Sequence, residues 1–166
     1  MSDKPFRLMI VAPNDRLYEK VQAAARLCAY SVPMVQVCSW DRAMAMAKQF
    51  PGSVLLVQWQ SNDVPPLLPN MAELHRRLPN VTLAVFVPDL PNLPVSLGES
   101  LRLSMFESGA TMVLGSPREL PTLLAVTKRC ESRVPVPEMS ITERIWNALP
   151  FKPPISPKRE RGGNSL

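Results

Sequence analysis

The stretch GATMVLGSPREL, residues 109–120, is the part of the sequence that indicates the fold most specifically. Gly109 is a residue type that commonly ends a helix, and TMVLG (111–115) is a short apolar run typical of a buried strand. Ser116 then forms a turn with Pro117, which sits near the first position of a new helix, where its missing N–H costs nothing. The stretch therefore predicts a helix, a strand and another helix in quick succession, as in an α/β protein.

Working outward from this stretch, four more compact apolar runs read as buried strands: RLMIVAP (7–13), MVQVCSW (34–40), SVLLVQW (53–59) and VTLAVFV (81–87). Between these strands we expect four helices. The first begins at a cap formed by Asn14 or Asp15 and continues to Tyr30, and the second covers 41–50 after a cap at Ser39 or Asp41. The third covers 71–78 after a cap at Asn70, and the fourth covers about 97–108. Strands that alternate with helices predict a three-layer, doubly wound parallel sheet of five strands in the order 2-1-3-4-5.

The chain of 166 residues is long enough for one domain with its own core. We expect a domain over 1–133, a proline-containing linker and short amphipathic helix over 134–151, and a basic, disordered tail over 152–166. No apolar run approaches the roughly 20 residues of a membrane helix, and the start lacks the pattern of a signal peptide, so a cytoplasmic protein without a membrane segment is expected. The three cysteines are widely spaced and are expected to be reduced, buried thiols.

The element order and local patterns of residues 6–132 resemble the receiver domain of bacterial two-component response regulators. In that family an acidic pair after strand one holds Mg²⁺, an aspartate at the end of strand three accepts phosphate, a Thr or Ser ends strand four, and a lysine precedes a cis proline after strand five. By resemblance, the matching positions here are occupied by residues of other chemical types. They are Ala12 and Pro13 after strand one, Val57 (or Gln58 if the register shifts by one) in strand three, Phe86 (or Val85 or Val87) in strand four, and Ser116 after strand five.

These substitutions remove the chemistry that the resemblance would otherwise imply. Mg²⁺ requires oxygen ligands, and an acyl phosphate requires a carboxylate nucleophile and a compensating cation. Asp15, Asp63 and Asp89 fall on connections, where helix caps or solvated acids are the expectation. His75, the one histidine, falls away from the strand ends, so the Ser116 hydroxyl is expected to cap a turn rather than act as a nucleophile. We therefore expect a degenerate, non-catalytic receiver with no metal and no cofactor.

A module without a chemical site has to act through its surface, and a protein partner is the expectation. Working receivers communicate through their fourth helix, fifth strand and fifth helix, and by resemblance this surface covers residues 97–133. A second candidate surface is the stretch ITERIWNALPF (141–151), whose apolar stripe either folds back on its own domain or fills a groove on a partner. The candidate partner contacts are Arg102, Glu107, Arg118, Lys128, Ile141, Ile145, Trp146, Leu149 and Phe151.

Two other functions stay open at this point. Residues 118–166 contain nine Lys/Arg and five Asp/Glu, so the basic C-terminal third could bind nucleic acid, although no helix-turn-helix or zinc module accompanies it. Alternatively, an apolar pocket left by Ala12, Val57 and Ser116 could serve a small-molecule sensor or an unrecognised enzyme. A glycine-rich nucleotide-binding loop is missing from the sequence.

Overall fold

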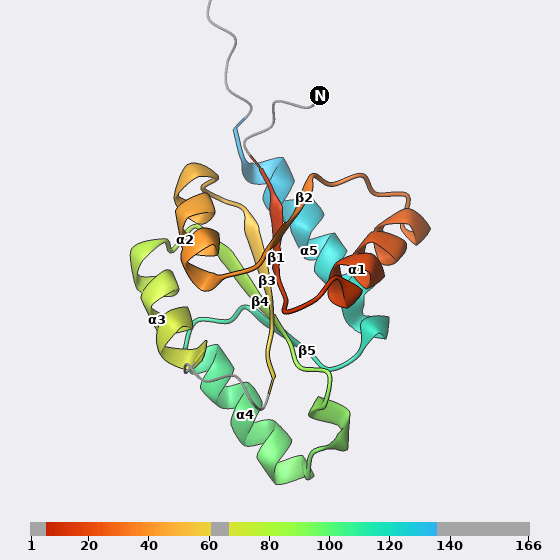
Figure 1. Ribbon diagram of the computed structural model, residues 1–166, viewed down its shortest axis with the longest axis vertical. Helices are drawn as coiled ribbons and strands as arrows, with labels where there is room; N and C mark the ends of the chain where they lie inside the picture. The colour runs from red at the N-terminus through yellow and green to blue at the C-terminus, as the bar shows by residue number, and fades with distance from the viewer. Residues whose placement is uncertain (1–5, 61–66, 136–166) are drawn as a thin grey trace, which may run out of the picture. The chain divides into compact units, whose positions relative to one another are not determined.

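The computed structural model describes residues 6–60 and 67–135, and the fold predicted for this part of the chain is confirmed. Five parallel strands form one sheet in the order β2-β1-β3-β4-β5, with helices on both faces (Figure 1). Each strand is a few residues shorter than the apolar run that predicted it. The strands are β1 (Leu8–Val11), β2 (Met34–Val37), β3 (Val54–Gln58), β4 (Thr82–Phe86) and β5 (Met112–Leu114).

Both faces of the sheet are buried, which is why its strands are apolar throughout rather than alternating. Along β3 the side chains of Val54 and Leu56 pack toward one layer of helices, and those of Leu55 and Val57 pack toward the other. The first layer consists of α1 and α5, and the second of α2, α3 and α4 (Figure 1). The helices are α1 (Arg16–Leu27), α2 (Trp40–Gln49), α3 (Leu67–Arg77), α4 (Val95–Glu107) and α5 (Leu120–Arg133), and two short 3₁₀ turns, η1 (Leu90–Asn92) and η2 (Pro117–Glu119), precede α4 and α5.

Two predicted helix boundaries are wrong. Asn70 does not cap α3 but lies inside it, because the helix already begins at Leu67; Pro69 is tolerated there since N–H groups of the first turn have no partner within a helix. The helix α1 ends at Leu27 rather than Tyr30. Its end is closed by a left-handed residue, Ala29 at φ 48°, and by a hydrogen bond of 3.0 Å from the N–H of Tyr30 to the carbonyl of Ala25.

The predicted cap of α2 is confirmed, and the cap of α1 has a more specific form than expected. The Ser39 hydroxyl accepts a hydrogen bond from the N–H of Arg42. At α1 the side chain of Asn14 accepts from the N–H of Arg16 at 3.1 Å, whereas Asp15 occupies the cap position without a capping side-chain bond.

Gly109 ends α4 as predicted, and its role depends on backbone conformation as well as on space. It has φ +100°, a region that residues with a Cβ rarely adopt. A Cβ built at this position would lie 2.5 Å from the Cβ of His75 on α3. Gly109 therefore allows the chain to leave α4, pass close to α3 and enter β5.

The last helix, α5, ends at Arg133, and the domain boundary expected at residue 133 stays a prediction. The expected linker and amphipathic helix over 134–151, apart from its first two residues, and the expected tail over 152–166 lie outside the described residues.

Candidate functional site

The carboxyl ends of β1 and β3 form the place where a doubly wound sheet usually binds its ligand. Val11 is paired with Val37 on one side and with Val57 on the other, so these three strands end at nearly the same level. Ala12 follows β1 and is 5% exposed, while Val57 near the end of β3 is 3% exposed. The centre of the candidate site is therefore made of buried apolar side chains.

A shallow groove of about 280 Å³ lies over these strand ends. The polar side chains that the described part of the chain places at its edge are an amide on β3, another on α3, a hydroxyl at the start of α2 and a thiol, and none of these is a carboxylate. Trp40, at the start of α2, contributes an aromatic wall. The lining residues are Val11, Ala12, Pro13, Cys38, Ser39, Trp40, Val57, Gln58, Leu67 and Asn70.

Gln58, the alternative position for the missing aspartate, is the last residue of β3 and lines the same groove. It pairs with Phe86 on β4, and Phe86 is 3% exposed. Whichever of Val57 and Gln58 corresponds to the phosphate acceptor, the position lacks the carboxylate that would have to form an acyl phosphate.

The acidic residues of the neighbouring connections do not supply the missing carboxylates within the part of the chain that is described. Asp15 and Asp89 are exposed and occupy the N-cap positions of α1 and η1, and neither lines the groove. Asp63 lies outside the described residues. Among residues 6–60 and 67–135 there is no group of three His, Cys, Asp or Glu side chains that could hold a metal ion.

Ser116 caps a turn, as predicted, through a reciprocal arrangement with Glu119. Its hydroxyl accepts from the N–H of Arg118 at 3.3 Å. The Glu119 carboxylate in turn accepts from the backbone N–H of Ser116 at 2.9 Å and from that of Gly115 at 2.6 Å. This capping box places the acidic side chain of Glu119 in the turn after β5. The resemblance predicts a lysine in the same turn, at the position of Ser116. All peptide bonds between described residues are trans, so Pro117 also departs from the family's cis proline.

The single apolar pocket expected from Ala12, Val57 and Ser116 is not formed. Ser116 lines a different groove, of about 590 Å³, between the end of β5 and the start of α4. The capping box holds the chain after β5 in a tight turn, which explains why its serine does not join the other two residues. The second groove is lined by Leu90, Pro91, Leu93, Val95, Gly98, Glu99, Arg102, Gly115, Ser116 and Glu119.

His75 is exposed on α3 and lines neither groove. Its ring packs beside Gly109 instead. It is therefore not placed to act as a base toward Ser116, in agreement with the capping role of that hydroxyl.

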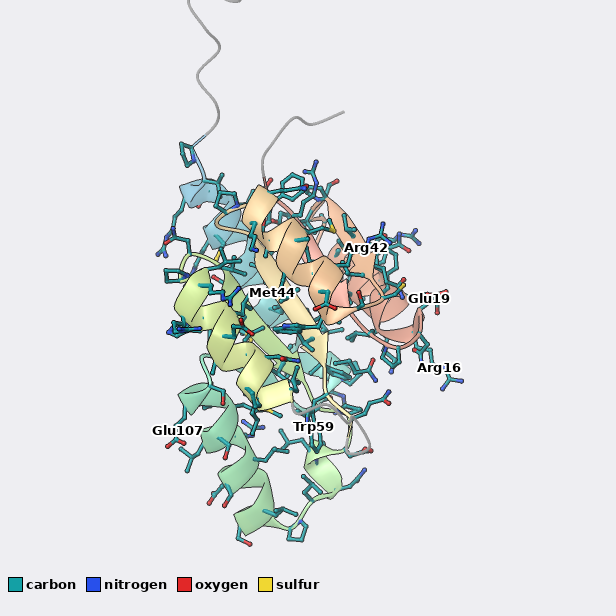
Figure 2. All side chains as sticks on the ribbon, turned by 60° about the vertical axis from the view of Figure 1, so that its left-hand side comes forward. Arg16, Glu19, Arg42, Met44, Trp59 and Glu107 are labelled. Carbon is teal, nitrogen blue, oxygen red and sulfur yellow. The ribbon has the colours of Figure 1, made fainter. Side chains whose placement is uncertain are left out.

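The candidate partner contacts within the described residues are all on the surface. Arg102 and Glu107 are exposed on α4, Arg118 is exposed in η2 and Lys128 is exposed on α5. Figure 2 shows Glu107 on the outer side of the domain, pointing away from the sheet. The remaining candidates, Ile141, Ile145, Trp146, Leu149 and Phe151, lie outside the described residues.

Sequence reasoning missed the apolar part of the α4 surface. Four large hydrophobic side chains on this helix are well exposed, although only charged residues were predicted there. The available signal was the helix sequence VSLGESLRLSMFE, whose apolar residues occur on all sides instead of on one stripe. They are Val95 (78% exposed), Leu97 (53%), Leu103 (62%) and Phe106 (45%).

A polar contact connects the two helices of the first layer, α1 and α5. The Tyr30 hydroxyl donates a hydrogen bond of 2.7 Å to the Glu131 carboxylate and so connects the end of α1 to α5. Burial, followed by this hydrogen bond, raises the pKa of Tyr30 well above its ordinary value. Neither Tyr30 nor Glu131 lines the two grooves described above.

No protein-family model and no curated protein matches the sequence, but solved structures match the fold. A response regulator from Thermotoga maritima is similar with a TM-score of 0.57 and 15% identity, covering 76% of this chain and 97% of the other. A putative pilus assembly-related protein from Burkholderia pseudomallei gives 0.56 and 16%, covering 82% and 97%. A CheY-like protein, TadZ, from Pseudomonas aeruginosa gives 0.57 and 12%, covering 75% and 98%. The chain therefore has the receiver fold predicted from its sequence. In the described residues no helix is long and apolar enough to cross a membrane.

Proposed function

We propose that this chain is a receiver-like regulatory module that acts in bacterial signalling by binding another protein, and that it is neither an enzyme nor switched by phosphorylation at the usual site. The observation that carries the proposal is the chemistry at the carboxyl ends of β1 and β3. Buried Ala12 and Val57 stand there, and no carboxylate of the described residues lines the groove above them. A hard divalent cation would have to leave water for a site without anionic ligands, which is strongly unfavourable.

A regulatory role without phosphate requires an accessible surface, and α4 supplies one. Its exposed apolar side chains, together with Arg102 and Glu107, form a mixed surface of the kind that protein partners bind. The similar solved proteins include a response regulator and a pilus assembly-related protein, so the fold alone does not select a pathway.

We prefer this function to the two alternatives on the evidence of the described residues. A sensor using a pocket shared by Ala12, Val57 and Ser116 loses its basis, because these residues line two separate grooves. A nucleic-acid interface would rest on the basic residues beyond 117, most of which lie outside the described residues.

The experiment is a titration of the ¹⁵N-labelled full chain with beryllofluoride and Mg²⁺, which together mimic an acyl phosphate in a working receiver. When beryllofluoride is added in the presence of Mg²⁺, we expect the amide resonances of Ala12, Val57 and Ser116 to keep the positions that they have with Mg²⁺ alone. A working receiver domain treated in parallel provides the positive control. Shifts that require both beryllofluoride and Mg²⁺ and that cluster at these three residues would overturn the proposal.

A further inference from the structure

The edge of the sheet at which the strands begin carries a concentration of positive charge. Helices between parallel strands return the chain to this edge, and Figure 1 shows α2 and α5 ending at the end of the domain where β1 begins. Basic residues occupy the last turns of α2, α3 and α5, and another precedes β1. Together with a further arginine on α5 they form a surface that we call the basic edge, which consists of Arg7, Lys48, Arg76, Arg77, Arg129 and Arg133. All of them except Arg7 are exposed.

Few acidic residues of the described chain balance this charge. Two lie in the same helix ends, and each already accepts a bond from a neighbouring side chain. Glu73 pairs with Arg77 at 2.7 Å, and Glu131 accepts a hydrogen bond of 2.7 Å from the Tyr30 hydroxyl. The helix α4 is different, since it ends at Glu107. With these two carboxylates included, six positive and two negative charges leave the basic edge an excess of four.

Stabilisation of the helices does not account for the whole of the basic edge. A cation in the last turn of a helix interacts favourably with the helix dipole, and one cation per helix fulfils that role. However, α3 ends with both Arg76 and Arg77. Arg7 belongs to no helix, and its guanidinium lies 4.9 Å from the centre of the Phe50 ring. The surplus of cations therefore points to an anionic partner.

A groove of about 490 Å³ opens within the basic edge. It lies at the starts of β3 and β4, between the turn that follows α2, the turn that follows α3 and the end of α5. Its walls are largely apolar, and its polar groups include a guanidinium and an amide. The lining residues are Pro51, Gly52, Asn80, Thr82, Cys130, Arg133, Val134 and Pro135.

Several members of the basic edge lie close to this groove. Lys48 and Arg77 each stand three residues before a lining residue, and Arg133 is itself part of the wall. Arg7 is held beside the turn after α2, because its backbone N–H donates a hydrogen bond of 3.0 Å to the Ser53 hydroxyl. An occupant of the groove would therefore meet cations on more than one side.

Apolar walls surrounded by cations determine the chemistry of the occupant. A segment that is both acidic and partly apolar would place an apolar side chain in the groove and its carboxylates on the arginines, which bind carboxylates through paired N–H groups. The rest of the chain does not supply this charge, because residues 136–166 contain five Lys/Arg and three Asp/Glu. A second copy carries the same net charge of +5 and would on the whole be repelled.

A protein segment fits this surface better than nucleic acid does. Proteins hold single-stranded nucleic acid by stacking its bases on aromatic side chains. Of the aromatic rings described at this edge, Phe50 has the Arg7 guanidinium over it and Phe6 is completely buried. The described part of the edge consists of helix ends and short turns, without a protruding helix or strand pair that could enter a groove of duplex DNA.

We propose that the basic edge binds an acidic segment of a partner protein, with an apolar side chain of that segment in the groove between the turn after α2 and the end of α5. The inference rests on the proposed function in treating the chain as a protein-binding module. It assigns a surface at the end of the sheet opposite to the vacated site. Because the cations are exposed, we expect a weak complex that is sensitive to salt.

Fluorescence anisotropy with the full chain tests the proposal directly. The probe is a fluorescein-labelled peptide in which one leucine lies between two runs of glutamate. We expect saturable binding at low ionic strength that weakens with added salt. Replacing the leucine by glycine should weaken binding about tenfold, because the apolar contact in the groove is lost. Absence of binding, or equal binding of a peptide with glutamine in place of glutamate, would overturn the proposal.

Two double variants with the same change in net charge localise the binding. Lys48→Gln with Arg133→Gln removes two cations of the basic edge, whereas Arg42→Gln with Arg118→Gln removes two exposed cations near the opposite end of the sheet. We expect the first variant to bind the glutamate peptide at least about fivefold more weakly than the natural chain, and the second to bind within about twofold of it. Circular dichroism and thermal unfolding confirm that both are folded. Equal losses would assign the binding to net charge and overturn the proposed surface.

Amide resonances of the ¹⁵N-labelled full chain show where the glutamate peptide binds. We expect shifts at Gly52, Asn80 and Thr82 and none at Ala12 or Val57. Shifts confined to α4 or to the carboxyl ends of the strands would overturn the proposal. A DNA duplex and a single-stranded RNA of mixed sequence are titrated in parallel. Tighter binding of either one through the same residues would identify nucleic acid as the partner instead, and would also overturn the proposal.

Failure of this inference is distinguishable from failure of the proposed function, because the two surfaces lie at opposite ends of the sheet. A chain that responds neither to the peptide nor to beryllofluoride would keep its phosphate-independent role and lose only the acidic partner. A chain that binds the peptide and also responds to beryllofluoride with Mg²⁺ would keep the acidic partner and lose the phosphate-independent role.

Discussion

Restoring the missing carboxylate is the most direct test of the reasoning about the vacated site. In Val57→Asp the new side chain lies at a position that is 3% exposed and is flanked in the sheet by Val11 and Val85. Among the residues that the structure describes, no cationic side chain lines the groove and could pair with it. The carboxylate is therefore expected to take up a proton rather than remain charged.

The magnitude follows from the cost of that proton. If burial raises the pKa of the new aspartate from about 3.9 to about 7, the folded state loses about 4 kcal/mol at neutral pH, at 1.36 kcal/mol per pKa unit. Replacing the buried methyl groups of Val57 adds about 1 kcal/mol or more. A loss of about 4–5 kcal/mol is a large part of the 5–15 kcal/mol that stabilises an ordinary domain.

The assay is urea unfolding of Val57→Asp and of the natural chain between pH 4 and pH 7. Since the folded state binds the proton of the new carboxyl more tightly than the unfolded state, the difference in unfolding free energy should be largest at pH 7 and should shrink as the pH falls. Val57→Asn, which is polar but does not titrate, should be destabilised by an amount that does not depend on pH.

An aspartate at position 57 that leaves the free energy of unfolding unchanged would contradict this prediction. If Val57→Asp unfolds within about 1 kcal/mol of the natural chain at pH 7, and if Mg²⁺ then stabilises it, the strand ends can solvate or pair a charge after all. The inert character of the site would then depend on one residue rather than on the whole groove.

Three further predictions concern stability, each measured by urea unfolding. Gly109→Ala should destabilise by about 2–4 kcal/mol, because φ +100° disfavours a Cβ and the Cβ of His75 lies 2.5 Å away; His75→Gly in the same background should recover part of the loss. Glu119→Ala should cost about 1–3 kcal/mol through the loss of two hydrogen bonds to backbone N–H groups, and Glu119→Gln less, since its amide oxygen still accepts. Tyr30→Phe should cost about 1 kcal/mol. The natural chain should also lose stability as the pH rises above about 10, where an unfolded tyrosine releases its proton but the half-buried, hydrogen-bonded Tyr30 keeps it. This loss should be smaller in Tyr30→Phe.

Each of these predictions has a result that would contradict it. A neutral Gly109→Ala would mean that the turn after α4 rearranges freely. Equal losses in the Ala and Gln variants at position 119 would assign its role to charge rather than to hydrogen bonding. Identical alkaline stability profiles for the natural chain and Tyr30→Phe would show that the Tyr30 hydroxyl does not cause the loss of stability.

The fold could be predicted from the sequence because its strands are buried on both faces. A run such as LLV in β3 is apolar without alternation, and Gly109 and Ser39 mark the places where helices end and begin. The start of α3 could not be found, because Pro69 reads as a helix breaker although it stands in a first turn, where it breaks no hydrogen bond.

The candidate site was predictable only in part. The identities of Ala12 and Val57 follow from counting along two strands, which bring them to the same edge of the sheet. The contribution of Trp40 depends on the path from β2 into α2, and the separation of Ser116 depends on a capping bond formed by a side chain three residues later. Neither is a property of local periodicity.

The capping box after β5 has a consequence for any anion that diffuses to this end of the sheet. The N–H groups of Gly115 and Ser116 point at one spot, and the Glu119 carboxylate already occupies it at 2.6 and 2.9 Å. Because that carboxylate is tethered to the same few residues, its effective concentration exceeds that of any free competitor in solution. The Glu119 carboxylate is thus an intramolecular competitor for these N–H groups, and an incoming phosphoryl group would first have to displace it.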